Sequence, residues 1–294
     1  MYKALADAIA EAESSNMRLA DVALNAESRD QGRPVEEIRA VLKRALDVMR
    51  SAIEQGSVGD LKSASGLVGG DAAKLRNDAH GPLADTVFRE ILTRALAVQE
   101  VNAAMGVIVA APTAGGAGVL PAILTGLAKQ KNVPDEKVVD ALATAGLIGA
   151  VVAERASLSG AEGGCQAETG AAAGMAAGAA TEMLGGTPSQ AGHAVALTMQ
   201  GMLGLVCDPL GGLVELPCVF RNATGSAMAL AGIEMAMAGI TFAIPVDEVI
   251  DVMGEIGREM DVRYRETAGG GLAATPTGRR LAKERLYQIK RSDG

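Results

Sequence analysis

The core of this chain has to be built almost without aromatic side chains. Of its 294 residues, 49% are hydrophobic, yet only 2% are aromatic and tryptophan is absent. Alanine, leucine, valine, isoleucine and methionine must therefore fill the interior, and alanine and leucine favour helices. Alanine and glycine at contact positions also let neighbouring helices approach closely. This combination predicts an all-α, multi-helix globular domain and argues against a β-sandwich.

Helical periodicity supports this prediction along most of the chain. Apolar residues recur at three- and four-residue steps over 35–49, with Pro34 suited to the first turn. We expect one domain over residues 1–294: amphipathic helices in 1–50, a core in 51–278, and a charged surface tail, helical or disordered, in 279–294. The further expected helices cover residues 82–101, 134–156, 170–184, 188–201, 222–245 and 245–260.

Charge and composition exclude two classes of partner. The formal net charge is −8 and no basic patch with interleaved aromatic residues occurs, which argues against nucleic acid. The apolar stretches are short or interrupted by Glu234 and Pro245, so we expect no membrane-spanning helix. An odd number of cysteines and an N-terminus without a signal-peptide pattern favour a reducing cytoplasm.

Three cysteines lie in or beside turns rich in glycine and proline. Between Cys165 and Cys207 stand 41 residues, and between Cys207 and Cys218 stand 10. Three thiols without a fourth suggest a cluster held at three corners, with one metal position left for chemistry. Glycines would let the backbone pass close to such a core. The spacing fits equally well with three buried cysteines that act as small apolar residues. It matches no zinc-finger or ferredoxin pattern.

Two further glycine-rich segments could hold a small ligand. Residues 59–71 offer hydroxyls, flexible N–H groups and one lysine to a carboxylate or an ammonium group. Residues 110–118 form a glycine-rich turn before an apolar helix, which offers N–H groups to an anion but carries no nucleotide-binding motif. The alternatives are an ordinary solvent loop for the first segment and close helix packing for the second.

These segments resemble the iron–sulfur-dependent L-serine dehydratases, specifically the α subunit of the two-subunit form. The similarity covers nearly the whole chain, from about Asp47 to Lys283, and is strongest in residues 111–121, 162–168, 207–218 and 265–267. It implies glycine loops that converge on a 4Fe–4S cluster held by Cys165, Cys207 and Cys218. It also implies a lyase reaction in which L-serine loses water and the resulting imine hydrolyses to pyruvate and ammonia.

The resemblance and the chemistry of the side chains together suggest a substrate site. Arg265 is a candidate clamp for the substrate carboxylate, because a guanidinium binds carboxylate through two hydrogen bonds; the alternative is a structural ion pair with Glu266 or another neighbour. The residues expected to bind substrate are Ser63, Ser65, Gly66, Thr113, Ala114, Gly115, Gly116 and Arg265.

The sequence does not identify the general base that must remove the α-proton. The weak candidates are His80, His193, Glu162 and Glu168. His193 lies in an apolar helical stretch, where a hydrogen-bonded core histidine is the simpler interpretation. Either glutamate could instead support the cluster, and a partner subunit could supply the base.

Two departures from single-chain relatives matter. Some of those relatives end in a fourth cysteine that reaches back to the cluster, whereas this sequence ends at Gly294 without one. We therefore expect the open iron to be held by water, substrate or a foreign ligand. Single-chain members also carry an additional domain, so we expect a separate β subunit and an oligomeric enzyme.

Three other functions compete with this interpretation. A pyridoxal-phosphate dehydratase could use Lys62 beside Ser63, but it would leave the three cysteine turns unexplained. A related desulfidase would act on L-cysteine, because iron can take a thiol as readily as a hydroxyl. A non-catalytic iron–sulfur sensor or structural subunit would keep the cluster without turnover.

Overall fold

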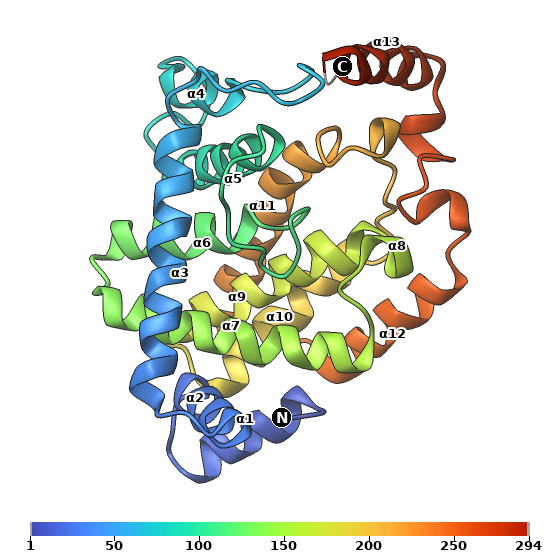
Figure 1. Ribbon diagram of the computed structural model, residues 1–294. Coiled ribbons are helices and arrows are strands. Elements are labelled where there is room, and N and C mark those ends of the chain that lie inside the picture. The colour runs from blue at the N-terminus through green and yellow to red at the C-terminus, as the bar shows by residue number, and fades with distance from the viewer. Residues whose placement is uncertain (1, 293–294) are drawn as a thin grey trace.

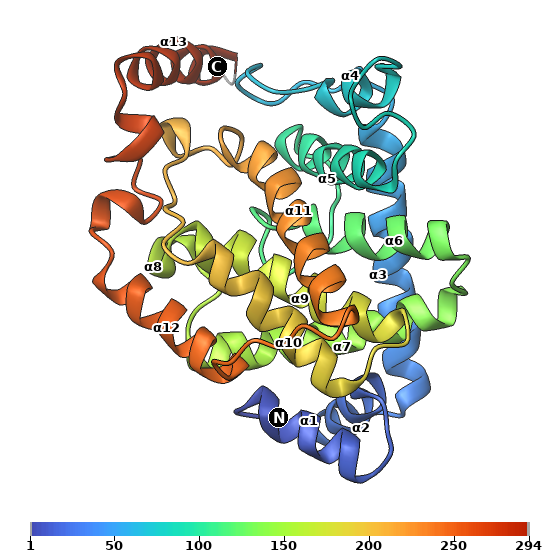
Figure 2. The same ribbon diagram turned by 180° about the vertical axis from the view of Figure 1, so that it is seen from behind.

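The chain folds almost entirely into α-helices, with almost no β-pairing between its segments. The computed structural model describes residues 2–292, and within them the chain forms thirteen α-helices and no strand beyond a single bridge between Cys207 and Arg265 (Figures 1 and 2). The all-α prediction is therefore confirmed. The helices are α1 (Leu5–Ser14), α2 (Leu19–Gln31), α3 (Val35–Gly56), α4 (Asp71–Asn77), α5 (Val87–Ala103), α6 (Val119–Lys131), α7 (Asp135–Arg155), α8 (Gly160–Gly163), α9 (Ala171–Met183), α10 (Pro188–Met199), α11 (Cys218–Met237), α12 (Val246–Glu259) and α13 (Pro276–Ser292).

Helix α9 forms the centre of the core and is buried along nearly its whole length. It packs against α6, α7, α10 and α11 (Figure 1). Its glycines make these close approaches possible: a Cβ on Gly178 would lie 2.6 Å from Cδ1 of Ile148 on α7, and one on Gly174 would lie 2.7 Å from Cγ of Met199 on α10. A sequence with few aromatic side chains thus folds into closely packed helices.

Buried carboxylates from distant parts of the chain cap three helix N-termini. Asp247 accepts hydrogen bonds from the N–H groups of Leu5 and Ala6 at 2.8 and 3.0 Å. Glu182 accepts from the first N–H groups of α2, and Glu100 accepts from those around the start of α4. Each cap satisfies backbone donors that a helix leaves free and places a negative charge at the positive end of the helix dipole. The peripheral helices are thereby fixed to the core.

Several element boundaries differ from those the sequence suggested. Helix α3 continues past residue 50 to Gly56, where a Cβ would lie 2.0 Å from the backbone oxygen of Ala97 on α5. The helix expected over 222–245 is α11, which begins at Cys218 and ends at Met237. The charged tail is helical from Pro276 to Ser292, and residues 293–294 lie outside the described residues. No helix among residues 2–292 combines the length and apolar character needed to cross a membrane.

Candidate functional site

Three separate segments bring the cysteines together in the interior. Cys165 stands between α8 and a π-helical turn, Gln166–Gly170, that leads into α9. Cys207 lies in the loop after α10, and Cys218 is the first residue of α11. All three are free thiols and at most 5% exposed. Cys207 and Cys218 lie close enough to Cys165 that a thiolate at Cys165 would repel negative charge at either of them.

Burial makes the thiols hard to ionise, and the nearby Arg221 guanidinium only partly offsets this at Cys165 and Cys218. Burial raises the pKa of all three, with the neighbouring thiols and Glu168 adding to the rise at Cys207 and Cys218; the pKa of Cys218 reaches about 12. Metal ligation reverses this balance, because thiolate is the form that binds soft metals. No three His, Cys, Asp or Glu side chains of residues 2–292 are placed to hold a single metal ion. An iron–sulfur cluster requires a different arrangement, because each thiolate binds a different iron atom.

Glu168 lies among the three thiols. Its carboxylate accepts a 2.7 Å hydrogen bond from Oγ1 of Thr113, and Sγ of Cys207 lies 4.0 Å from its Oε2. Burial raises the pKa of this carboxyl group, and Glu266 adds to the rise. The residue projects from the π-helical turn, a local widening of the helix that often occurs at functional sites.

Glycines on two loops leave room for this carboxylate. A Cβ on Gly115 would lie 3.0 Å from both Glu168 carboxylate oxygens, and one on Gly160 would lie 2.6 Å from Oε2 and 3.1 Å from Sγ of Cys207. A Cβ on Gly116 would lie 2.9 Å from the backbone oxygen of Glu168. Close packing is therefore one role of the 110–118 segment, and the same packing places Thr113 on Glu168.

The 110–118 segment is also fastened to the helix that carries Cys218. The side-chain amide of Asn222 donates to the backbone oxygens of Gly115 and Cys218 at 2.7 and 2.9 Å, while its oxygen accepts from the N–H of Gly118 at 2.9 Å. Gln99 on α5 holds the oxygen of the exposed Ala114 at 2.9 Å. Asn222 is fully buried, so these bonds are worth more than they would be in water.

The segment around Ser63 and Ser65 is an ordered turn docked on the loop between Cys207 and Cys218. Both serines are buried, and Ser65 donates its hydroxyl and its N–H to the carboxylate of Glu215. The hydroxyl of Ser63 accepts from Val68, and the N–H of Gly66, at a φ of 71°, donates to the oxygen of Ser63. The structure therefore does not support a free solvent loop, and most donors that this turn offers in the sequence are already used. In both overall views it runs beside α13 (Figures 1 and 2).

Arg265 is placed directly beside Cys207 by backbone pairing. The N–H of Cys207 donates to the oxygen of Tyr264 at 2.8 Å, and the N–H of Glu266 donates to the oxygen of Cys207 at 2.9 Å. The Arg265 side chain lines a cavity of about 370 Å³ with Ser157, Glu162 and other residues, and its buried Nε has no hydrogen-bond partner among the described residues. No described carboxylate pairs with it, Glu266 included. The Arg265 side chain and the turn around Ser63 line different cavities. The cavity at the turn is open and has a volume of about 550 Å³.

The other candidate bases lie elsewhere. His193, half-buried on α10, accepts a 3.3 Å hydrogen bond from the N–H of Phe242 in the turn after α11, which is the role of a structural histidine. His80 is exposed in the turn between α4 and α5. Glu162 is exposed and accepts from Ser157 at 2.6 Å. Of the four candidates, Glu168 is the one that the structure brings to the thiols.

Sequence reasoning missed Arg221, Asp208 and Glu215. Arg221 forms a 2.7 Å ion pair with Asp208 and donates to the oxygen of Val206 at 2.7 Å, within reach of the Cys165 thiol. The spacing of Arg221 from Cys218 could have indicated this position, because residues three apart lie on the same face of a helix. Asp208 and Glu215 offered no such signal, since their partners are far away in the sequence.

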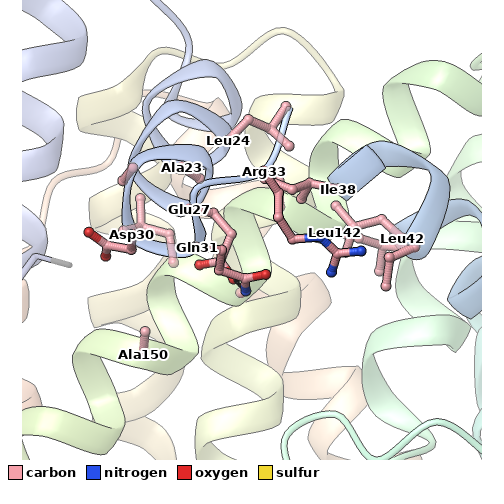
Figure 3. Close-up of a pocket in the computed structure, with 15 residues that line it drawn as sticks. Ala23, Leu24, Glu27, Asp30, Gln31, Arg33, Ile38, Leu42, Leu142 and Ala150 are labelled. Atoms are coloured by element: carbon pink, nitrogen blue, oxygen red, sulfur yellow. Dashed lines mark hydrogen bonds between the residues drawn. The ribbon is translucent and has the colours of Figure 1, made fainter. Parts of the chain in front are cut away.

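An apolar cavity lies away from these residues. It has a volume of about 450 Å³ and is formed by α2, α3 and α7, with Leu24, Ile38, Leu42 and Leu142 along its walls and Arg33 and Glu27 at its rim (Figure 3). None of the cysteines or the candidate substrate residues lines it. We therefore assign the candidate site to the cysteine segments.

Comparison with known proteins gives a consistent result. Residues 14–273 match the family model described as serine dehydratase alpha chain. The chain is 47% identical over 290 residues to a probable L-serine dehydratase alpha chain of Bacillus subtilis, covering 97% of this chain and 95% of that one. It is 40% identical to the L-serine dehydratase alpha chain of Peptoniphilus asaccharolyticus, covering 92% and 94%. An L-serine dehydratase of Streptomyces coelicolor is 42% identical over 85% of this chain, which spans 56% of that protein.

Proposed function

The chain belongs to the serine dehydratase alpha-chain family, and we propose that it is the α subunit of an iron–sulfur L-serine dehydratase that converts L-serine to pyruvate and ammonia. The observation that carries this proposal is the convergence of three buried thiols on one partly buried carboxylate, Glu168. A lyase that must remove a proton and a hydroxide from neighbouring carbons needs both an acid and a base at one place.

The cofactor that fits this donor set is a 4Fe–4S cluster held by Cys165, Cys207 and Cys218. When bound with three cysteine ligands, such a cluster supplies one iron that can act as a Lewis acid on a departing hydroxyl group. Glycine is needed close to the thiols: a Cβ on Gly160 would lie 3.1 Å from Sγ of Cys207 and 2.6 Å from Oε2 of Glu168.

The residues of the chain itself have distinct roles in this proposal. Glu168 is the candidate base, because it is the carboxylate next to the thiols, and Thr113 fixes one of its oxygens. Arg265 would hold the substrate carboxylate, for which its unpartnered Nε provides a donor. The turn of Ser63, Ser65 and Gly66 would form a wall of the site, held in place by Glu215, while Ala114, Gly115 and Gly116 would shape the opposite wall.

A separate β subunit would complete the enzyme. Relatives of similar length are named alpha chains, whereas the Streptomyces relative, named L-serine dehydratase, is nearly twice as long as the part that this chain matches. We further propose an oligomeric, cytoplasmic enzyme, in line with the three free cysteines.

Anaerobic reconstitution tests the proposal directly. The purified chain would be loaded with iron and sulfide, and pyruvate formation from L-serine would be measured with and without the partner chain. We expect iron and sulfide to be retained, broad absorbance near the 400 nm region typical of iron–sulfur proteins, and turnover that increases strongly with the partner. Faster reaction with L-cysteine would favour a desulfidase, and a loaded but inactive complex would favour a non-catalytic subunit. A sharp band that shifts with amino acid would indicate pyridoxal phosphate.

A further inference from the structure

Arg221 is a buried cation that the proposed reaction does not use. It lies on α11, three residues after Cys218, and its side chain is 15% exposed. Its two terminal guanidinium nitrogens bind the residues that flank Cys207: one donates to the oxygen of Val206 at 2.7 Å, and the other forms a 2.7 Å ion pair with Asp208. The same guanidinium is in hydrogen-bonding and Coulombic reach of the Cys165 thiol. One side chain therefore meets all three cysteine segments.

Asp208 is held as firmly as its partner. Its side chain is 3% exposed, and its second oxygen accepts a 2.6 Å hydrogen bond from the N–H of Leu272. A Cβ on Gly271 would lie 2.2 Å from that oxygen, so the turn closes tightly over the carboxylate. The pair is thus fixed in orientation, with the positive end towards Cys165 and the negative end against the turn.

A buried ion pair of this kind rarely adds stability for its own sake. Removing two charges from water costs several kcal/mol per ion, and their attraction only roughly repays that cost. A cationic group facing three thiols has a different use, because thiolates bound to iron carry negative charge that a nearby cation offsets. Local charge and hydrogen bonds to the sulfurs are among the factors that set the potential of an iron–sulfur cluster.

We propose that Arg221 and Asp208 form a fixed charge pair that sets the reduction potential of the cluster, with Arg221 raising it and Asp208 lowering it. This inference rests on the cluster of the proposed function. A positive charge beside the thiolates stabilises the reduced, more negative form of the cluster, whereas a negative charge disfavours it. Both are positioning residues, because they act through the cysteine segments rather than on the substrate.

Potentials of loaded variants test the pair. Wild type, Arg221→Gln, Arg221→Lys and Asp208→Asn would be reconstituted anaerobically, and the one-electron midpoint potential would be measured by titration with dithionite under electron paramagnetic resonance. We expect a more negative potential for Arg221→Gln, a more positive one for Asp208→Asn, and a value near wild type for Arg221→Lys. The matched control is Arg94→Gln, which removes an arginine paired with Glu90 and Thr125 away from the cysteine segments, and it should leave the potential unchanged.

Opposite signs for the two charge removals are the decisive result, because a merely structural pair would shift both variants alike. If both move in one direction, or neither differs from the Arg94→Gln control, the inference is wrong. If Arg221→Gln fails to fold, the contrast between Arg221→Lys and Asp208→Asn still decides it, with circular dichroism as the check on folding. A wild-type chain that retains no iron would instead sink the proposed cofactor, and this inference with it.

Discussion

Thr113 shows how much one hydroxyl can matter in this site. It makes the 2.7 Å hydrogen bond that fixes Glu168 beside the thiols, and it stands on a segment that Asn222 and Gln99 hold from two helices. The glycines that follow it allow the approach but provide no polar contact of their own to Glu168. Besides the Cys207 thiol, whose Sγ lies 4.0 Å from Oε2, Thr113 is the side-chain donor that orients this carboxylate.

We predict that Thr113→Val lowers kcat by about 10- to 100-fold, because a hydrogen bond to a charged group is worth about 1.5–3 kcal/mol. Valine keeps the shape and removes only the donor. Thr113→Ser restores the hydroxyl and should recover most of the activity, which makes it the matched control. Steady-state kinetics of both variants at equal iron content is the measurement. A Thr113→Val enzyme with the kcat of wild type would show that Thr113 does not orient Glu168.

Some helix contacts in this molecule require glycine, whereas other glycines inside helices have space for a side chain. On α11, a Cβ at Gly232 would lie 2.0 Å from Oγ1 of Thr198 and 2.9 Å from the oxygen of Ala194, both on α10. On α7, a Cβ at Gly146 would meet nothing within 4 Å. The two residues are both inside helices, so they separate packing from helix propensity.

Gly232→Ala should destabilise the fold by about 1–3 kcal/mol, because the methyl group forces α10 and α11 apart. Gly146→Ala should stabilise it by about 0.5–1 kcal/mol through the lower backbone entropy of alanine in the unfolded chain. Urea unfolding of the two variants beside wild type measures both effects. Equal stabilities would contradict the close approach of α10 to α11.

Glu182 links the N-terminal helices to the core through its bonds to Leu19, Ala20 and Thr144. Glu182→Ala should cost about 1–3 kcal/mol, since it leaves these donors without a partner. Burial raises the pKa of Glu182, so its contribution is largest below the pKa of the unfolded chain and declines as pH rises through the folded pKa. The stability gap to wild type should therefore be wider near pH 4.5, the ordinary pKa of a glutamate, than at pH 7.5. Glu255→Ala, an exposed change on α12, should show no such gap.

Much of the helical architecture could be predicted from the sequence, because it rests on local information. The cap of α10 is an example: Thr187 accepts from the N–H of Gln190 and Pro188 occupies the first turn, as their spacing suggested. The start of α11 was placed four residues late, because Pro217 and the turn before it gave no sign that Cys218 already begins the helix.

The site was predictable only where a resemblance singled out residues. The three cysteines lie near one another and Thr113 contacts Glu168, whereas their roles as cluster ligands and in substrate binding stay predictions. The contacts of Glu168, Glu215 and Arg221 depend on partners 39, 150 and 13–15 residues away. No periodicity records such pairings, because they arise only when distant segments of the chain come together in the folded molecule.

Each cysteine segment belongs to a different part of the fold. Cys165 precedes the central helix α9, Cys218 begins α11, and Cys207 lies in a loop that pairs with residues 264–266 and accepts the N–H of Gln166 at the oxygen of Leu205. A cofactor bound by all three would tie the core, the loop and the C-terminal turn to one another. The thiols alone cannot do this, since burial keeps them protonated and uncharged.

We therefore predict that loading the cofactor stabilises the whole molecule. A ligand that binds only the folded state stabilises it by about 2.7 kcal/mol at 100 times its Kd, which for a chain of 294 residues corresponds to a rise in Tm of about 4 °C. Anaerobic thermal unfolding, followed by circular dichroism with and without bound iron, measures the rise. Cys165→Ser, Cys207→Ser and Cys218→Ser should each abolish it, because the loss of one corner releases one segment. Ser226→Ala, a buried change eight residues after Cys218 on the same helix, is the control and should keep the rise. If one serine variant retains both the iron and the rise in Tm, its cysteine is not a ligand, and the role of that segment is packing alone.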